Sequence, residues 1–328
     1  MKFAFIDAER AAWPVRPMCR VLRVSPAGYY AWRSRPESTH AREDRRLGVL
    51  VKEAHARSRA IYGSPRVHKK MRGAGEVVGR KRVVRLMREH GLRGRVRRKF
   101  VHTTVRDEAQ PVAANVLARD FTASRPNERW VSDATYLRTP AGFLYLAVVL
   151  DLYSRFIVGW ALGAFNDRHL ALRALDMAVR RRAPGAGLLH HSDRGSTYTS
   201  EDYQDELTRL GVTCSMSRAG NCIDNAAMES WNGTLKTELG ESFESLRHAR
   251  NALFDYIEVF YNNERLHSTL GYMSPRDFER VHAHVAPIGQ LSGNEDDSQP
   301  VAAVAVGALQ ITEVSDPSRV SDSDPLCL

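Results

Sequence analysis

The spacing of hydrophobic residues changes near Trp130, and this change separates a helical part of the chain from a part that combines strands with helices. Beyond Trp130, three runs rich in Val, Leu, Ile and aromatic residues follow one another with only short polar turns between them. Such runs are typical of neighbouring strands. We predict strands at 129–139, 142–152 and 155–163.

Helical spacing of apolar residues then alternates with two further short apolar runs. The predicted helices cover 167–182, 200–211, 225–239 and 247–266, and the predicted strands cover 188–193 and 212–217. A meander of three strands followed by α/β units predicts an α/β fold, in which a mixed sheet carries helices on both faces.

The first 95 residues show helical spacing throughout. Residues 1–45 are predicted as a basic helical segment. Residues 46–95 contain a Gly-Ser-Pro turn, a helix start at Pro65, the break GAGEVVG and a second helix from Arg80. Two short helices joined by a break predict a DNA-binding region that resembles a helix-turn-helix.

Three further segments complete the predicted domain organisation. Residues 96–124 are predicted as a linker and 125–285 as the core. Residues 286–328 lack a regular hydrophobic pattern. They are acidic and rich in Ser, Asp, Ala and Gly. Because such a composition buries little apolar surface, we predict a mostly disordered tail.

Charge is distributed unevenly along the 328 residues. The chain has a formal net charge of +10, but residues 1–100 carry +19, 101–124 carry −1, 125–280 carry −2 and 281–328 carry −6. Positive charge confined to the N-terminal third indicates a polyanionic partner, most simply nucleic acid.

The predicted second helix of the helix-turn-helix-like region is itself strongly basic. Its candidate DNA-binding residues are Arg80, Lys81, Arg82, Arg85 and Arg88. Such a helix either reads base edges in the major groove or contacts only phosphates, and the pattern leaves both open.

Several classes of protein do not fit this sequence. The longest apolar run, FLYLAVVL at 143–150, is too short to cross a membrane, and charged residues occupy the N-terminus where a signal peptide needs an apolar stretch. The four cysteines form no CxxC pair, so neither a disulfide framework nor a zinc site is indicated. We expect a cytosolic protein.

Three acidic residues are candidates for a shared site. Asp133 lies inside the first predicted strand, where Asp is depleted. Asp193 ends the fourth predicted strand, where α/β folds place their sites, although Asp is also a common turn residue. Glu229 faces away from the apolar side of the helix 225–239, with Lys236 two turns further on the same side. A solvated Glu and Lys would show the same pattern.

If the first and fourth strands are neighbours and the 225–239 helix crosses them, these three carboxylates converge. Like charges at close range need a cation, and oxygen ligands without Cys or His favour magnesium or manganese. Two such ions roughly 3.5–4 Å apart would support in-line phosphoryl transfer. His190 and His191 precede Asp193, and at the end of a buried strand such residues are more often structural than ligands.

Three segments resemble the signatures of DDE transposases and retroviral-type integrases. They are RWVSDATYL, HHSDRGSTYTS and NAAMESWNGTLKTEL, with thirty-five residues between Asp193 and Glu229. The stretches YGSPRVHKKM and YNNERLHSTLGYMSPRDF are similar to segments of the insertion sequence 3 family. The match covers 15–280, so the chain is identified as a member of that family, of the type encoded in its second reading frame.

The resemblance implies an RNase H-like core that uses two Mg²⁺ or Mn²⁺ ions to cleave and join DNA strands. Asp133, Asp193 and Glu229 match the catalytic metal ligands, and Lys236 matches a residue that contacts the DNA end. Arg265 lies in a family motif and is a further candidate DNA contact. The remaining motif residues have no assigned role: they are Asn225, Ser230, Asn262 and His267.

The same resemblance implies partners and a location. The expected partners are double-stranded DNA at element ends and target, a second copy of the chain, and a DNA-binding protein from an upstream frame. The expected location is the bacterial cytoplasm, at the nucleoid. Because the chain has only Cys19 in its first 45 residues, it lacks the N-terminal His-His-Cys-Cys module of retroviral integrases, which favours the bacterial branch.

Two other functions remain open from the sequence. A DNA-binding protein with an inactive integrase-like domain would keep the basic N-terminal third, but the three carboxylates are all present. A metal-dependent nuclease would use the same carboxylates without joining strands.

Overall fold

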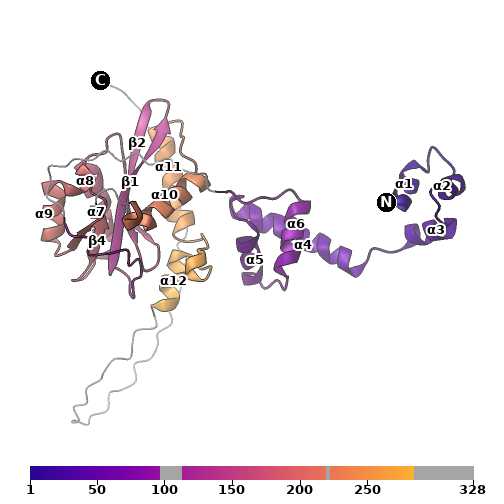
Figure 1. Ribbon diagram of the computed structural model, residues 1–328, viewed down its shortest axis with the longest axis horizontal. Coiled ribbons are helices and arrows are strands. Elements are labelled where there is room, and N and C mark those ends of the chain that lie inside the picture. Colours follow the sequence, from indigo (N-terminus) through magenta and orange to yellow (C-terminus); the bar gives the residue numbers. More distant parts are fainter. Residues whose placement is uncertain (97–112, 219–221, 284–328) are drawn as a thin grey trace, which may run out of the picture. The chain divides into compact units, whose positions relative to one another are not determined.

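The computed structural model describes residues 1–96, 113–218 and 222–283 (Figure 1). Most of the predicted linker and the whole predicted tail at 286–328 lie outside the described residues.

Three short helices at the N-terminus enclose a small apolar cluster. They are α1 (Lys2–Glu9), α2 (Val15–Val21) and α3 (Pro26–Ser34). Ile6, Met18, Cys19 and Tyr29 form the cluster. The Tyr29 hydroxyl donates a hydrogen bond of 2.8 Å to Asp7, so the buried phenol keeps a polar partner.

The helix-turn-helix-like region consists of α4 (Thr39–Arg57), α5 (Ser64–Gly73) and α6 (Arg80–Glu89). Pro65 lies in the first turn of α5, where its missing N–H costs nothing, and α6 begins at Arg80 as predicted. Ser38 caps α4 by accepting a hydrogen bond from Ala41 N. Since α4 runs from 39 to 57, it passes through residue 45, where the sequence pattern suggested a boundary.

A five-stranded mixed sheet forms the core. Its strands are β1 (Arg129–Thr139), β2 (Gly142–Asp151), β3 (Ile157–Gly163), β4 (Leu189–Ser192) and β5 (Thr213–Met216), in the order β3-β2-β1-β4-β5. The first three strands are antiparallel neighbours, whereas β4 runs parallel to β1 and β5 runs parallel to β4. The predicted mixed α/β sheet is therefore confirmed, and β1 is its central strand.

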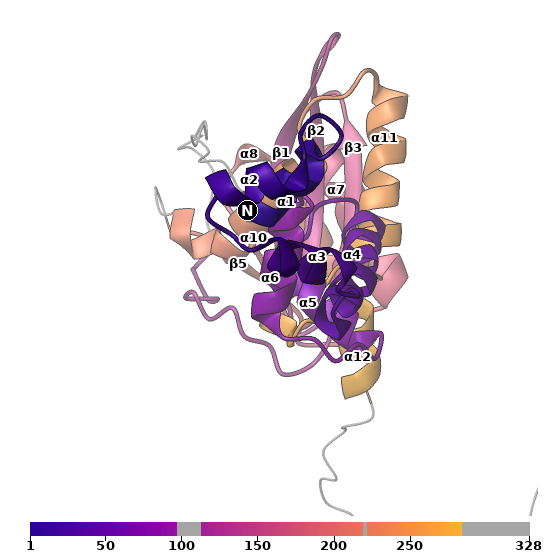
Figure 2. The same cartoon turned by 90° about the vertical axis from the view of Figure 1, so that its right-hand side faces the viewer.

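Helices cover both faces of the sheet (Figure 1). Successive residues of a strand point to opposite faces, so Trp130 packs in the apolar cluster of α7 (Arg168–Arg182) and α9 (Glu201–Arg209), while Val131 packs in the cluster of α10 (Ala226–Glu238) and α11 (Leu246–Phe254). Figure 2, turned by 90°, again shows α11 beside the strands.

The contact between α7 and the sheet explains one glycine. A Cβ at Gly159 of β3 would lie 2.1 Å from the carbonyl oxygen of Ala174 and 2.8 Å from the backbone N of Ala178. Only glycine lets the strand approach the helix backbone this closely.

Three elements differ from the predicted pattern. The short helices α8 (Ser196–Thr199) and α12 (Pro275–His282) were not predicted. The single helix predicted at 247–266 is α11 followed by a π-helical segment, Asp255–Tyr261. Two 3₁₀ turns, Cys222–Asn225 and Ser268–Leu270, flank the later helices. Among residues 1–96, 113–218 and 222–283, no helix has both the length and the apolar character that a membrane span requires.

Candidate active site

Asp133 and Asp193 are brought together by parallel strand pairing. In the β1–β4 ladder Arg129 pairs with Leu189 and Val131 with His191, a constant offset of 60 residues. The same register carried two residues further places Asp133 level with Asp193, directly after the end of β4. This is the carboxyl edge of parallel strands, where α/β sheets place their sites.

Helix α10 supplies Glu229 and is fixed to β1 near Asp133. The amide of Asn225, at the start of α10, donates a hydrogen bond of 3.1 Å to the carbonyl oxygen of Ser132. Met228, Trp231 and Leu235 are buried on the packing face of α10. Glu229 is only partly buried, as its position opposite that face predicts.

The three carboxylates interact electrostatically. Burial raises the pKa of Asp133 well above its usual value, and the charges of Asp193 and Glu229 raise it further. Burial also raises the pKa of Asp193. Partly buried carboxylates that repel one another when ionised are typical of cation sites and of active sites.

Two hydrogen bonds orient these carboxylates. The Asn232 amide donates to Asp133 Oδ2 at 2.7 Å, and the backbone N–H of Gly195 donates to Asp193 Oδ1 at 3.0 Å. Both bonds favour the ionised carboxylates and lower the pKa that burial raises. Asn232 lies three residues after Glu229 on α10, so one helix both contributes a carboxylate and orients a second one.

Lys236 lies on the Glu229 side of α10 and against an aromatic ring. Its ammonium is 4.1 Å from the centre of the Tyr136 ring of β1. Burial lowers the pKa of Lys236, and the nearby Arg138 lowers it further. The Tyr136 ring thus holds the Lys236 ammonium in a partly buried position, where the charge of Asp133 also acts on it.

His190 and His191 are structural. Both are fully buried. His190 Nε2 hydrogen-bonds with Ser132 Oγ at 2.8 Å, and His191 lies 2.9 Å from Ser215 Oγ and 3.1 Å from Ser217 Oγ. Burial lowers the pKa of His190 to about 3 and that of His191 to about 4, so both rings are neutral at physiological pH.

Asp224 holds the start of α10 in place, and the sequence pattern did not single it out. It is fully buried and accepts hydrogen bonds from the side chains of Asn115, Arg119 and Arg218. The hydrogen bond from Arg218 holds the pKa of Asp224 below its usual value, although burial opposes this. Segments more than 100 residues apart in the sequence thus meet at Asp224, five residues before Glu229. Local sequence patterns cannot reveal such a contact.

Tyr198 of α8 leaves a polar atom unpaired beside the two aspartates. Its side chain is buried, and its hydroxyl has no hydrogen-bond partner among the described residues. Burial raises the pKa of Tyr198, with smaller contributions from Tyr203, Asp133 and Asp193. A buried hydroxyl without a protein partner next to carboxylates is suited to a ligand or an ordered water.

The donor set and the electrostatics of this site fit divalent cations. The side chains that meet are oxygen donors, which Mg²⁺ and Mn²⁺ prefer. Within residues 1–96, 113–218 and 222–283, however, no three His, Cys, Asp or Glu side chains are arranged as a ready set of metal ligands. The charges of Asp193 and Glu229 both act on Asp133.

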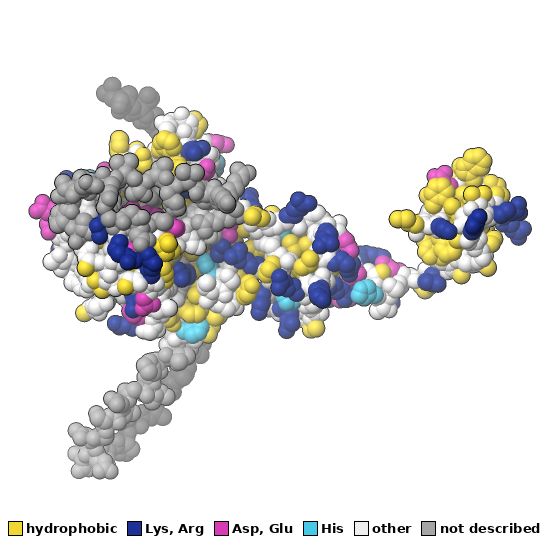
Figure 3. Space-filling model, in the orientation of Figure 1, with side chains coloured by type: hydrophobic (Ala, Val, Ile, Leu, Met, Phe, Trp, Pro, Cys, Tyr) yellow, Lys and Arg dark blue, Asp and Glu magenta, His cyan; other side chains and the backbone are white. Residues whose placement is uncertain are grey.

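The candidate DNA-binding residues of α6 divide into two groups. Arg80, Lys81 and Arg88 are exposed, whereas Arg82 and Arg85 each form an ion pair of 2.7 Å with Asp44 of α4. Figure 3 shows Lys and Arg side chains spread over the surface of α4–α6. The first group is available to phosphates, while the second helps to hold α6 against α4.

Arg265 occupies a different environment from an exposed DNA contact. It is 4% exposed, and its guanidinium donates two hydrogen bonds of 2.7 Å to the carboxylate of Glu238. The Arg265 guanidinium is therefore paired inside the protein and is not exposed as the predicted DNA contact would be.

Comparisons with known proteins agree with these features. Sequence models of the integrase core domain match residues 123–222 and 210–275, and the model of the HTH-like domain matches residues 41–100. Transposase InsF for insertion sequence IS3A of Escherichia coli (strain K12) is 42% identical over 283 residues, which cover 85% of this chain and 98% of that protein. The insertion element IS600 uncharacterized 31 kDa protein of Shigella sonnei is 43% identical over 271 residues, covering 82% of this chain and 100% of that protein.

Similarity to solved structures is weaker. The HTLV-2 integrase catalytic core domain in complex with magnesium shares 16% identity at a TM-score of 0.38, covering 47% of this chain and 97% of that one. A match at this level carries no argument beyond the fold already described.

Proposed function

The chain belongs to the insertion sequence 3 family of transposases, and from that premise we propose that Asp133, Asp193 and Glu229 form the centre that cleaves DNA at the element ends and joins it to a target. One observation carries the proposal. Parallel pairing of β1 with β4 sets Asp133 level with Asp193, and the charge of Glu229 on α10 acts on Asp133.

The three carboxylates are the residues that would hold two divalent ions. When bound, such ions neutralise the carboxylates and stabilise the attacking and leaving oxygens of a phosphodiester. The repulsion that raises the pKa of Asp133 is then replaced by attraction.

The protein itself contributes orientation and positive charge. Asn232 and the N–H of Gly195 hold the two aspartates in place through single hydrogen bonds. Lys236, on the same side of α10 as Glu229, is placed to contact a phosphate of the DNA end. Water and the DNA 3′-hydroxyl are the nucleophiles in this scheme, so no Ser or Tyr is assigned that role.

The N-terminal third supplies DNA affinity in this proposal. Exposed Arg80, Lys81 and Arg88 of α6 are suited to phosphate contacts. Because two element ends must be joined, the active species contains at least two copies of the chain. The proposed further partner is a DNA-binding protein encoded upstream, present as a separate subunit or as a fusion. The proposed location is the nucleoid.

Strand transfer on DNA that carries an element end tests the proposal. With Mg²⁺ present, Asp133→Asn, Asp193→Asn and Glu229→Gln are each expected to lower the rate at least about 10³-fold, because each removes a carboxylate that would hold the divalent ions. DNA binding measured in EDTA is expected to stay unchanged. Asp176→Asn, an exposed acidic residue of α7, is the matched control and keeps its activity.

Two results would overturn the assignment. Wild-type rates in any one of the three variants would remove that residue from the centre. Cleavage without joining, under conditions in which both ends are bound, would identify a nuclease instead.

A further inference from the structure

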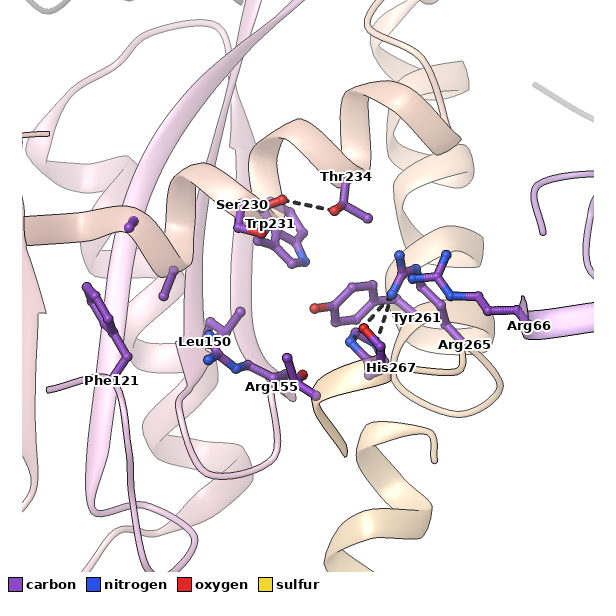
Figure 4. A pocket seen from close by; sticks show the side chains of 14 residues that line it. Arg66, Phe121, Leu150, Arg155, Ser230, Trp231, Thr234, Tyr261, Arg265 and His267 are labelled. Atoms are coloured by element: carbon purple, nitrogen blue, oxygen red, sulfur yellow. Dashed lines mark hydrogen bonds between the residues drawn. The ribbon is translucent and has the colours of Figure 1, made fainter. Parts of the chain in front are cut away.

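A pocket lies beside α10 (Figure 4). Its volume is about 310 Å³. Ser230 and Thr234 of α10 line it, and these positions lie roughly 100–140° around the helix from Glu229 at 100° per residue. The same helix therefore faces the carboxylates with one side and this pocket with another.

The charged side chains that line the pocket are all positive. Arg66, Arg155 and Arg265 line it, and the lining contains no Asp or Glu. Glu238 neutralises Arg265 through two hydrogen bonds of 2.7 Å and lies 3.7 Å from Arg66. Among the described residues, no carboxylate forms an ion pair with Arg155, so positive charge exceeds negative charge around the cavity.

A buried donor points into the same space. Trp231 is 3% exposed, and its indole Nε1–H has no hydrogen-bond partner among the described residues. Figure 4 shows this nitrogen and the Tyr261 hydroxyl directed into the cavity. An indole N–H can only donate, so the group that satisfies it must be an acceptor. Leaving such a buried donor unpaired is unfavourable, so the site favours an acceptor ligand.

The positive charge around the pocket also affects the pKa of His267, which lines it. Burial holds the pKa of His267 well below its usual value, and Arg265, Arg66 and Arg155 lower it further. The ring is therefore neutral and able to accept or donate, while the arginines supply the charge.

We propose that this pocket binds a backbone phosphate of the DNA, with Arg155 and the Trp231 N–H as its principal donors. A phosphate carries the acceptor oxygens that both groups require, and arginine suits phosphate geometry. The assignment rests on the proposed function, since DNA engaged by α10 at Glu229 passes next to Ser230. The pocket then anchors the strand on the side of α10 away from Lys236.

Arg155 permits a clean substitution. It has φ +61°, in the left-handed region, and Asn tolerates that conformation better than most residues. Arg155→Asn therefore removes the guanidinium with little backbone cost, while Arg155→Lys keeps the positive charge. Arg180→Gln is the matched control, because Arg180 is exposed on α7, which covers the other face of the sheet.

The measurement is DNA affinity against salt concentration in EDTA, so that it does not depend on bound metal. Loss of one phosphate contact lowers the slope of log K against log [salt] by about 0.9. The affinity ratio of wild type to Arg155→Asn is then expected to shrink about 3.5-fold between 50 and 200 mM salt, by the same slope. Arg155→Lys is expected to retain most of the slope, and Arg180→Gln all of it.

A second variant tests the neutral donor. Trp231→Phe removes the N–H and keeps an aromatic ring in the core. It is expected to weaken DNA binding by the same factor at every salt concentration. Ethylation interference is expected to identify one phosphate whose modification impairs wild-type binding but not that of Arg155→Asn.

Each result separates this proposal from the catalytic one. An Arg155→Asn slope equal to that of wild type would overturn the phosphate assignment. If inorganic phosphate raised the unfolding temperature of wild type but not of Arg155→Asn, and the DNA slope stayed unchanged, the pocket would bind a free anion instead. Failure of the catalytic assignment would appear only in strand transfer by Asp133→Asn, Asp193→Asn and Glu229→Gln.

Discussion

The two ends of α10 carry glutamates in opposite environments. Glu229 and Glu238 are nine residues apart, so they point to opposite sides of the helix, about 180° apart at 100° per residue. Glu238 is 8% exposed and accepts hydrogen bonds from Arg265 and from the Tyr256 hydroxyl. Glu229 is partly buried. Burial raises the pKa of Asp133, and the charges of Asp193 and Glu229 raise it further.

The charge of Glu238 stabilises the fold, whereas the proposed role of the charge of Glu229 is catalytic. A buried carboxylate that is paired and hydrogen-bonded satisfies its desolvated partners. Carboxylates that lie close together repel one another when ionised and destabilise the folded chain until a ligand binds, as is common at functional sites. Substitutions at the two ends of α10 should therefore change stability in opposite directions.

The largest effect is expected at the Glu238 end. Arg265→Met leaves Glu238 buried without its main partner and is expected to lower the free energy of unfolding by about 3–5 kcal/mol. Denaturant unfolding measures this loss. The double variant Glu238→Gln with Arg265→Met is expected to recover most of it; if it did not, packing rather than charge would explain the contact.

A smaller effect is expected on catalysis at the Glu229 end. Asn232→Ala removes the hydrogen bond of 2.7 Å to Asp133 and is expected to lower strand transfer about 10–100-fold, as for other partners that orient metal ligands. DNA affinity in EDTA serves as the control. Asn232→Asp is a sharper variant, because it keeps the size of the side chain and adds a further negative charge; activity above that of Asn232→Ala would contradict an orienting role.

Acid should weaken the attachment of α10 through Asp224. Its pKa is held below the ordinary value of 3.8 by Arg218, so its contribution to stability is present above that value and is lost as the pH falls below it. Asp224→Asn is expected to lower the unfolding temperature by about 2–4 °C at neutral pH. The difference from wild type should shrink below pH 3.8. A constant difference across this range would exclude the charge of Asp224 as its cause.

The smallest effect is expected to have the opposite sign. Asp133→Asn removes one of the negative charges that repel one another. The new amide oxygen can still accept the hydrogen bond from Asn232. The metal-free chain should therefore unfold about 2 °C higher. The unfolding temperature in EDTA measures this. Asp176→Asn is again the control, because Asp176 pairs with Arg180 on an exposed helix surface. A fall in stability for Asp133→Asn would contradict the comparison between the two ends of α10.

Much of the fold follows from short windows of sequence. The spacing of apolar residues located the five strands of the sheet and the helices α6, α7, α9 and α10 to within a few residues. This succeeds because burial of one face produces alternation in a strand and a period of 3.6 residues in a helix. Asp133 stood out because Asp is unusual inside a strand, and Asp193 because it ends a strand where α/β folds place their sites. The short helices α8 and α12 were missed because four and eight residues leave too little periodicity.

The sequence by itself determined which residue types lie on each element, and so which side of α10 carries Glu229 and Lys236. Only the tertiary structure decided which residues they contact. Asn232 reaches Asp133 across 99 residues, Arg119 reaches Asp224 across 105, and Arg155 shares a pocket with Arg265. Local periodicity sets the face of each element, whereas partners that far apart in sequence are set by strand register and by the path of the chain, which no short window contains.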